Sequence, residues 1–253
     1  MYGSHAGIHL EGKDAKMKNS MSRMGFLAVA GVSALALAGC GSSDEDEGSS
    51  STESAATEES TEPQPPELVE TGYTVIDGEY VMYGVGWTNP NSGYEIQYPV
   101  LKITGYDEDG SITFAEEQTM NFLKPGETQY FGCLAGSVEG TATAEFSVGE
   151  LEDYNFVESS EEPVEYYSIS NTNVVDDGYG GFNFTGEITT EVELEDYSEA
   201  WISVILRDDS GAIVYGNNDF VTVAAEGETT AFEVLAGTLP EYASYEIYAI
   251  PWL

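Results

Sequence analysis

The chain has 253 residues, of which 46 are acidic and seven are basic, so its formal net charge is −39. Four of the basic residues precede Cys40, and only Lys102, Lys124 and Arg207 follow it. Three scattered cations cannot neutralise a phosphate backbone or an anionic lipid surface, so we expect neither nucleic-acid binding nor membrane binding through charge. Hydrophobic residues make up 41% of the chain and aromatic residues 12%, which is enough for a folded core.

Residues 1–39 are predicted to be a secretory signal peptide. Lys18 and Arg23 give a positive start after Met17, an apolar run of about 13 residues follows, and small residues end the segment. The run is shorter than the roughly 20 apolar residues that a membrane-spanning helix needs. Because residues 1–16 do not fit this pattern, we expect translation to start between Met17 and Met24.

The end of this segment, Leu37-Ala38-Gly39-Cys40, resembles the lipobox of bacterial lipoproteins. The resemblance implies that a diacylglycerol is attached to the thiol of Cys40 and that a peptidase cleaves just before this residue. Two acyl chains anchor a protein stably where one gives only marginal binding. The expected mature protein is therefore extracytoplasmic, and its lipid anchor makes the cell membrane its first partner.

Residues 40–66 are predicted to form a disordered acidic linker behind the lipidated cysteine. Between Gly41 and Pro66 there is no large apolar residue, so this segment cannot bury a core. Like charges extend such a chain and prolines stiffen it, which gives a reach of up to about 90 Å. We interpret it as a spacer that carries the folded part away from the membrane. An acidic tail that collects cations is the alternative.

An internal repeat organises the remainder of the chain. Short sequence matches recur 101 positions apart without a gap, which indicates a duplicated unit of domain size. The matching pairs are Asp107–Ile112 with Asp208–Ile213, Gly126–Thr128 with Gly227–Thr229, Phe131 with Phe232, and Leu134–Gly136 with Leu235–Gly237.

Each copy is predicted to be all-β. Aromatic and β-branched segments such as Tyr80–Trp87 and Trp201–Leu206 alternate with turn clusters such as Asn89–Gly93, and no segment after the signal has a helical period with caps. Roughly seven strands in about 90 residues is typical of an immunoglobulin-like β-sandwich. We therefore expect two tandem sandwiches, a first repeat at 67–157 and a second repeat at 164–253. Whether the linker at 158–163 is a flexible hinge or a packed segment stays open.

The pattern is similar to that of FxLYD-type domains, small sandwich modules of bacterial envelope lipoproteins. The strict Phe-x-Leu-Tyr-Asp string is absent from both copies, so the resemblance rests on the wider pattern and implies only the fold and the location. Its carriers are Ile103–Gly110, Leu123–Thr128 and Phe131 in the first copy, and Val204–Gly211, Gly227–Thr229 and Phe232 in the second.

The residue types for most enzyme chemistry are missing from the mature chain. Both histidines, His5 and His9, precede Cys40, which removes Ser-His-Asp triads, Cys-His pairs and histidine metal sites. Cys133 would be the only free thiol; its repeat counterpart is Val234, so we expect a buried core thiol rather than a nucleophile. We expect no cofactor and no enzymatic activity. A carboxylate-based glycan hydrolase is the alternative, although so many acids make any carboxylate pair uninformative.

Acidic turns offer weak candidates for a metal site. Asp107 and Asp109 in the first copy, and Asp208 and Asp209 in the second, supply oxygen ligands of the kind that calcium prefers. None of these turns has the EF-hand spacing, and turn chemistry alone explains Asp and Gly here. We therefore expect solvated turns, with a calcium-dependent adhesin-like module as the alternative.

Two tyrosines are the predicted ligand contacts. Tyr94 and Tyr98 follow the Asn89–Gly93 turn and are expected to be exposed, whereas most other aromatic residues are expected in the cores. The sequence thus favours a non-enzymatic envelope lipoprotein that acts as a binding or spacing module. Its further partner would be an envelope protein or glycan that the sequence does not identify.

Overall fold

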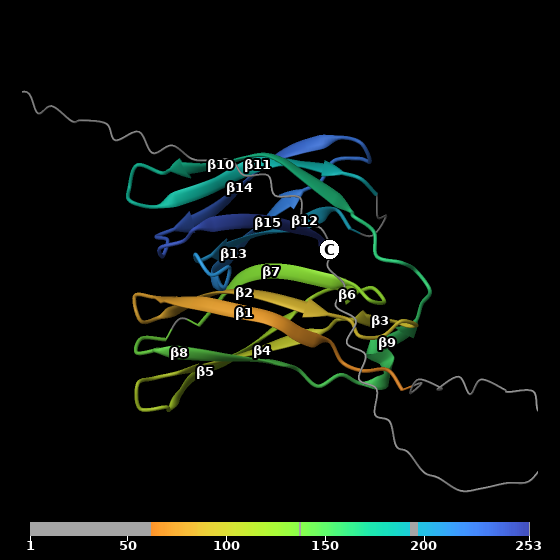
Figure 1. Ribbon diagram of the computed structural model, residues 1–253, viewed down its shortest axis with the longest axis horizontal. Helices are drawn as coiled ribbons and strands as arrows, with labels where there is room; N and C mark the ends of the chain where they lie inside the picture. The colour runs from red at the N-terminus through yellow and green to blue at the C-terminus, as the bar shows by residue number, and fades with distance from the viewer. Residues whose placement is uncertain (1–61, 137, 193–196, 253) are drawn as a thin grey trace, which may run out of the picture. The chain divides into compact units, whose positions relative to one another are not determined.

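The computed structural model describes residues 62–136, 138–192 and 197–252, and these form an all-β structure (Figure 1). This confirms the predicted fold class. The described residues contain five antiparallel sheets of three strands each and a single 3₁₀ turn, η1 (Asp153–Asn155). No helix in this part of the chain is long and apolar enough to cross a membrane. The predicted signal peptide, the lipidated cysteine and most of the predicted linker lie outside the described residues.

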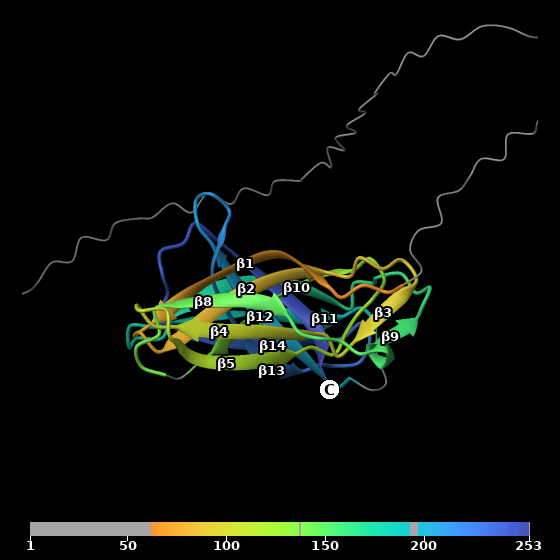
Figure 2. The same cartoon turned by 90° about the horizontal axis from the view of Figure 1, so that it is seen from below.

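The first repeat consists of two main sheets and one small sheet. The main sheets have the orders β1-β2-β7 and β5-β4-β8, and the small sheet has the order β6-β3-β9. The small sheet lies at one end of the stack in both views (Figures 1 and 2). The strands are β1 (Glu67–Ile76), β2 (Tyr80–Thr88), β3 (Tyr94–Gln97), β4 (Val100–Tyr106), β5 (Ile112–Thr119), β6 (Phe122–Leu123), β7 (Thr128–Ala135), β8 (Thr143–Val148) and β9 (Phe156–Glu158).

The second repeat has the same two main sheets in the same strand order, β10-β11-β14 and β13-β12-β15. Equivalent strands begin 101 positions apart at β7 and β14 and again at β8 and β15, as the sequence repeat requires. The strands are β10 (Tyr167–Asp176), β11 (Phe182–Thr190), β12 (Glu199–Arg207), β13 (Ile213–Thr222), β14 (Thr229–Gly237) and β15 (Ser244–Trp252).

The strand order is compatible with an immunoglobulin-like sandwich. In that fold, strands A, B and E share one sheet, and strands C and F neighbour each other in the other sheet. Here β10, β11 and β14 correspond to A, B and E, while β12 and β15 correspond to C and F. The first repeat follows the same scheme with β1, β2, β7, β4 and β8.

The four main sheets stack in one pile, with the β1-β2-β7 sheet facing the β13-β12-β15 sheet of the other repeat (Figure 1). The central strands of these two inner sheets are buried on both faces: seven consecutive residues are buried in β2, Val81–Trp87, and seven in β12, Ala200–Leu206. A strand in a single sandwich buries every second residue, because successive side chains point to opposite faces. Burial of seven in a row therefore reflects packing between the two repeats.

Glycines allow the two inner sheets to approach closely. A Cβ atom on Gly216 of β13 would lie 2.2 Å from the carbonyl oxygen of Tyr83, and one on Gly132 of β7 would lie 2.6 Å from the backbone nitrogen of Asn217. A Cβ atom on Gly72 would likewise collide with the backbone of Ile213. At the glycine positions of this seam, the backbones of the two repeats are in contact, and a side chain would push the sheets apart.

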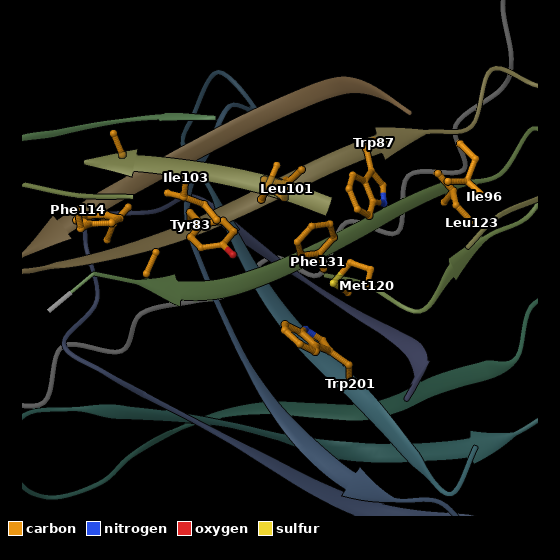
Figure 3. Packing of buried hydrophobic residues seen from close by; sticks show 14 residues of the cluster. Tyr83, Trp87, Ile96, Leu101, Ile103, Phe114, Met120, Leu123, Phe131 and Trp201 are labelled. Carbon is orange, nitrogen blue, oxygen red and sulfur yellow. The ribbon is translucent and has the colours of Figure 1, made fainter. Parts of the chain in front are cut away.

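The hydrophobic clusters also cross the boundary between repeats. Trp201 of β12 belongs to the cluster built around Trp87 and Phe131 of the first repeat, and its ring centroid lies 6.5 Å from that of Phe131 (Figure 3). Its indole nitrogen donates to the hydroxyl of Ser203 at 2.8 Å. In the opposite direction, Met82 of β2 packs in the cluster of the second repeat. The described residues accordingly fall within one compact unit.

The linker between the repeats is attached to the first repeat along its length. Its first residue, Glu158, belongs to β9 and pairs with Tyr94 of β3. The backbone nitrogen of Ser159 donates to the carbonyl oxygen of Gly93 at 3.0 Å. Glu161 accepts a hydrogen bond from the ammonium group of Lys124 at 2.6 Å. These contacts fasten the predicted 158–163 linker to the first repeat.

Candidate binding groove at the junction of the repeats

Some of the predicted site residues lie outside the described residues and others lie within them. The lipid-attachment residue Cys40 and the lipobox residues Leu37, Ala38 and Gly39 lie outside the described residues. Tyr94 of β3 is half-buried and pairs across the sheet with Glu158, whereas Tyr98 is 52% exposed with a φ of 53°. Neither tyrosine lies in the groove described below.

In each acidic turn, one aspartate carboxylate accepts hydrogen bonds from backbone N–H groups of the same turn. Asp107 Oδ1 accepts hydrogen bonds from the backbone nitrogens of Asp109 and Ser111 at 3.0 and 2.8 Å. Asp208 Oδ1 does the same for Ser210 and Ala212 at 2.8 and 3.0 Å. The Ser210 hydroxyl and these backbone groups hold the pKa of Asp208 below its usual range.

Asp109 and Asp209 are exposed beside these bonded carboxylates. Within the described ranges, no three or more His, Cys, Asp or Glu side chains are grouped so that they could hold a metal ion. The hydrogen bonds therefore assign Asp107 and Asp208 to turn formation.

Cys133 lies in β7 and is partly buried. Its sulfur is 3.9 Å from Gln118 Oε1 and 3.6 Å from the carbonyl oxygen of Leu134. Burial raises the pKa of this thiol. A raised pKa keeps the group as the poorly nucleophilic thiol, so the environment of Cys133 is that of a structural cysteine.

A groove of about 440 Å³ lies where the two repeats meet. Three segments line it: the start of β7 with the residue before it, the start of β10 with the residues between the linker and this strand, and β15. The lining combines nine aromatic or aliphatic residues with four polar or charged ones. Its residues are Glu127, Thr128, Gln129, Tyr130, Val164, Glu165, Tyr166, Tyr167, Ile169, Ile247, Tyr248, Ala249 and Ile250.

The groove follows the edges of sheets rather than a sheet face. Consecutive residues of a strand point to opposite faces, so a groove over one face would contact every second residue. Here Glu127–Tyr130 and Ile247–Ile250 each line it without interruption. β7 and β15 are both outer strands of their sheets. The groove is thus bounded by one sheet edge from each repeat.

Two stacked tyrosines form one wall, and an arginine fixes them. The rings of Tyr130 and Tyr248 lie 5.1 Å apart at 21° to one another. Arg207 lies over the Tyr130 ring at 5.7 Å, and it binds Glu70 of the first repeat and Glu246 of the second, each at 2.6 Å. Burial alone would lower the pKa of Arg207, but hydrogen bonds to the two carboxylates outweigh it and raise the pKa.

The lining of the groove contains a polar pair, the half-buried Glu127 and the buried Gln129. Glu127 accepts hydrogen bonds from the Lys124 backbone nitrogen at 2.7 Å and from Gln129 Nε2 at 3.0 Å. Burial raises the pKa of Glu127, and these hydrogen bonds oppose the rise only in part. Gln129 Nε2 also donates to the carbonyl oxygen of Phe122 at 3.1 Å, whereas Gln129 Oε1 is buried with no partner among the described residues.

The linker side of the groove is held by Lys124. Its ammonium group binds Glu95 at 2.8 Å and Glu161 at 2.6 Å and lies 5.4 Å from the Phe122 ring. Phe122 packs against Tyr166 with ring centroids 5.9 Å apart. Burial raises the pKa of Tyr166 to about 12, so its hydroxyl remains a neutral donor and acceptor at physiological pH.

The sequence reasoning missed this site, although a signal for it exists. The residues that fix the junction occur in one repeat only: Tyr130 corresponds to Ala231, Tyr248 to Ser147, and Arg207 to Tyr106. At these three positions the aromatic and cationic side chains of the junction have no counterpart in the other copy.

No protein-family model matches this chain, and no curated protein matches its sequence.

Proposed function

We propose that the protein is a lipid-anchored, extracytoplasmic, non-enzymatic binding module that holds its partner in the groove between the repeats. The groove carries the binding part of this proposal, because it combines stacked tyrosines, aliphatic residues of two strands and a few polar side chains in a single cleft. The anchoring part is supported by the signal-like segment and the lipobox-like sequence that ends at Cys40.

The way the repeats are joined favours binding over simple spacing. A spacer needs only length, which the acidic segment before the folded unit would supply. The junction instead uses Arg207 and Lys124, two of the three cations after Cys40, to fix the two sides of one groove. Groups held in this way need little ordering when a ligand binds, which lowers the entropic cost of binding.

Anchoring is tested by cell fractionation. The unchanged chain is expected in the membrane fraction, and Cys40→Ser is expected to remove the lipid site and shift the protein to the soluble extracytoplasmic fraction. Retention of the Cys40→Ser variant in the membrane would contradict anchoring through this residue.

Binding is tested with a photoreactive phenylalanine analogue introduced at Val164, which lines the groove and is 47% exposed. Val175 on β10 is 46% exposed and lies outside the groove lining, so the same analogue there is the matched control. Irradiation of the native envelope should give a defined crosslinked product from position 164 only. The same products from both positions, or none from position 164, would contradict binding in the groove.

A further inference from the structure

β15 has one free edge. It pairs with β12 along its whole length, and no other strand of the described residues pairs with it. At its end, the carbonyl oxygen of Pro251 accepts a hydrogen bond from Asn121 Nδ2 at 3.0 Å, and Pro251 has no N–H, so the open part of the edge precedes this residue. An edge strand presents a row of unpaired backbone N–H and C=O groups, which can serve as a template for another strand. Four consecutive residues of β15, Ile247–Ile250, line the groove, so this edge opens into it.

The fold has a defined place for an additional strand there. In an immunoglobulin-like sandwich, strand G lies beside strand F in the C-F-G sheet. β15 corresponds to strand F, and its sheet in the described residues ends at β15. A strand added along β15 would therefore occupy the position of strand G.

Side chains on both sides of this edge are suited to an extended chain with alternating residues. Tyr248 stacks on Tyr130 of the first repeat, while Ile247 and Ala249 pack against the core of the second repeat. An added strand would place alternate side chains toward these two surfaces. Apolar residues on the side of the second repeat would bury surface there, and backbone hydrogen bonds to β15 would supply the remaining affinity.

The charged residues around the groove indicate the charge of the strand that could bind there. Glu127 and Glu165 are the charged residues that line the groove. The nearest cations, Lys124 and Arg207, are each already bound to two carboxylates. An acidic segment would therefore be repelled, and a second copy of a chain with a net charge of −39 is disfavoured for the same reason.

We propose that the second repeat binds an extended, basic segment of another polypeptide as an added β-strand along β15. The inference rests on the proposed function, because it specifies the ligand of the same groove. Apolar residues of this segment alternate with lysine or arginine, and the cationic side chains lie toward Glu127 and Glu165.

The probe is a fluorescently labelled peptide of alternating valine and lysine, about nine residues long to match a strand. Fluorescence anisotropy with the full chain should show saturable binding at about 100 μM or tighter. A peptide methylated at alternate backbone nitrogens loses the N–H groups that pair with β15, and it should bind at least about tenfold more weakly. A valine and glutamate peptide should show no saturable binding.

A variant pair locates the binding. Val164→Lys places a cation in the groove lining and should weaken the valine and lysine peptide by about tenfold. Val175→Lys makes the same change at an equally exposed position outside the lining and should leave the affinity unchanged. Circular dichroism and melting temperature show whether each variant is folded.

Three results would overturn strand addition: no saturable binding, equal affinity for the methylated peptide, or equal loss in both folded lysine variants. A failed peptide experiment with a retained crosslink at position 164 rejects strand addition but leaves the binding groove standing. Loss of both signals rejects the binding part of the proposed function as well.

Discussion

Gly132 of the first repeat and Gly216 of the second lie back to back, and a Cβ atom built on either would come within 2.9 Å of the backbone of the other. Each glycine belongs to a strand of an inner sheet, so their contact sets the distance between the repeats. The groove depends on this distance, because its two sheet edges come from opposite sides of the same junction.

The glycine seam predicts a large effect for a small substitution. Gly216→Ala would place Cβ 2.2 Å from a backbone carbonyl oxygen, which must move, so the free energy of unfolding should fall by about 1–3 kcal/mol. Urea denaturation monitored by tryptophan fluorescence measures this. Gly93→Ala is the control, since a Cβ there meets nothing within 4 Å and should change stability by less than about 0.5 kcal/mol. Equal effects of the two substitutions would show that the seam is not tightly packed.

The Arg207 bridge is predicted to need the guanidinium group and not only a positive charge. Arg207→Lys retains the charge but cannot bind Glu70 and Glu246 with one rigid fork, so we expect a loss of about 1–2 kcal/mol in urea denaturation. In the control, Lys102→Met removes an exposed pair at 3.8 Å and should cost less than about 0.5 kcal/mol. Full stability of the Arg207→Lys variant would mean that the bridge contributes charge alone.

The environment of Glu127 leads us to expect a specific dependence of the protein's stability on pH. Burial raises the pKa of this carboxyl in the folded state above its value in the unfolded chain. The folded protein therefore binds the proton more tightly, and this contribution to stability is present at low pH and lost as pH rises through the raised pKa. Glu127→Gln should reduce the loss of stability between about pH 4 and pH 7, which urea midpoints across that range would show.

Glu161 serves as the control, because its pKa is shifted in the opposite direction and its effect on stability therefore has the opposite pH dependence. Lys124 lowers the pKa of Glu161, so that carboxylate contributes stability at neutral pH that is lost as pH falls. Glu161→Gln should therefore flatten the acid side of the stability profile. Identical profiles for the two variants would contradict the environment assigned to Glu127.

Cys133 is predicted to react slowly with alkylating agents. Burial raises its pKa, so little thiolate is present at neutral pH in the folded protein. In a Cys40→Ser background, the rate of iodoacetamide labelling should rise by at least about tenfold when the chain is unfolded in urea. Rapid labelling of the folded chain would instead indicate an activated thiol.

The sequence determined the β class and the duplicated unit. Turn clusters separate β-branched and aromatic segments, and the 101-residue offset predicts which strands are equivalent. Both are local or repetitive properties that a single chain displays directly. The Asp-x-x-Gly turns belong to the same group, because Asp107 and Asp208 close them with hydrogen bonds to their own backbone neighbours.

The tertiary structure alone decided how the repeats meet and where the groove lies. Val81–Trp87 and Ala200–Leu206 suggest strands in the sequence, but burial on both faces arises only when one sheet packs on another. Glu70, Tyr130 and Arg207 are far apart in the chain and meet only at this junction. Sequence periodicity reports which face of a strand is apolar, whereas the partner of a sheet and the exposure of its edge depend on long-range packing.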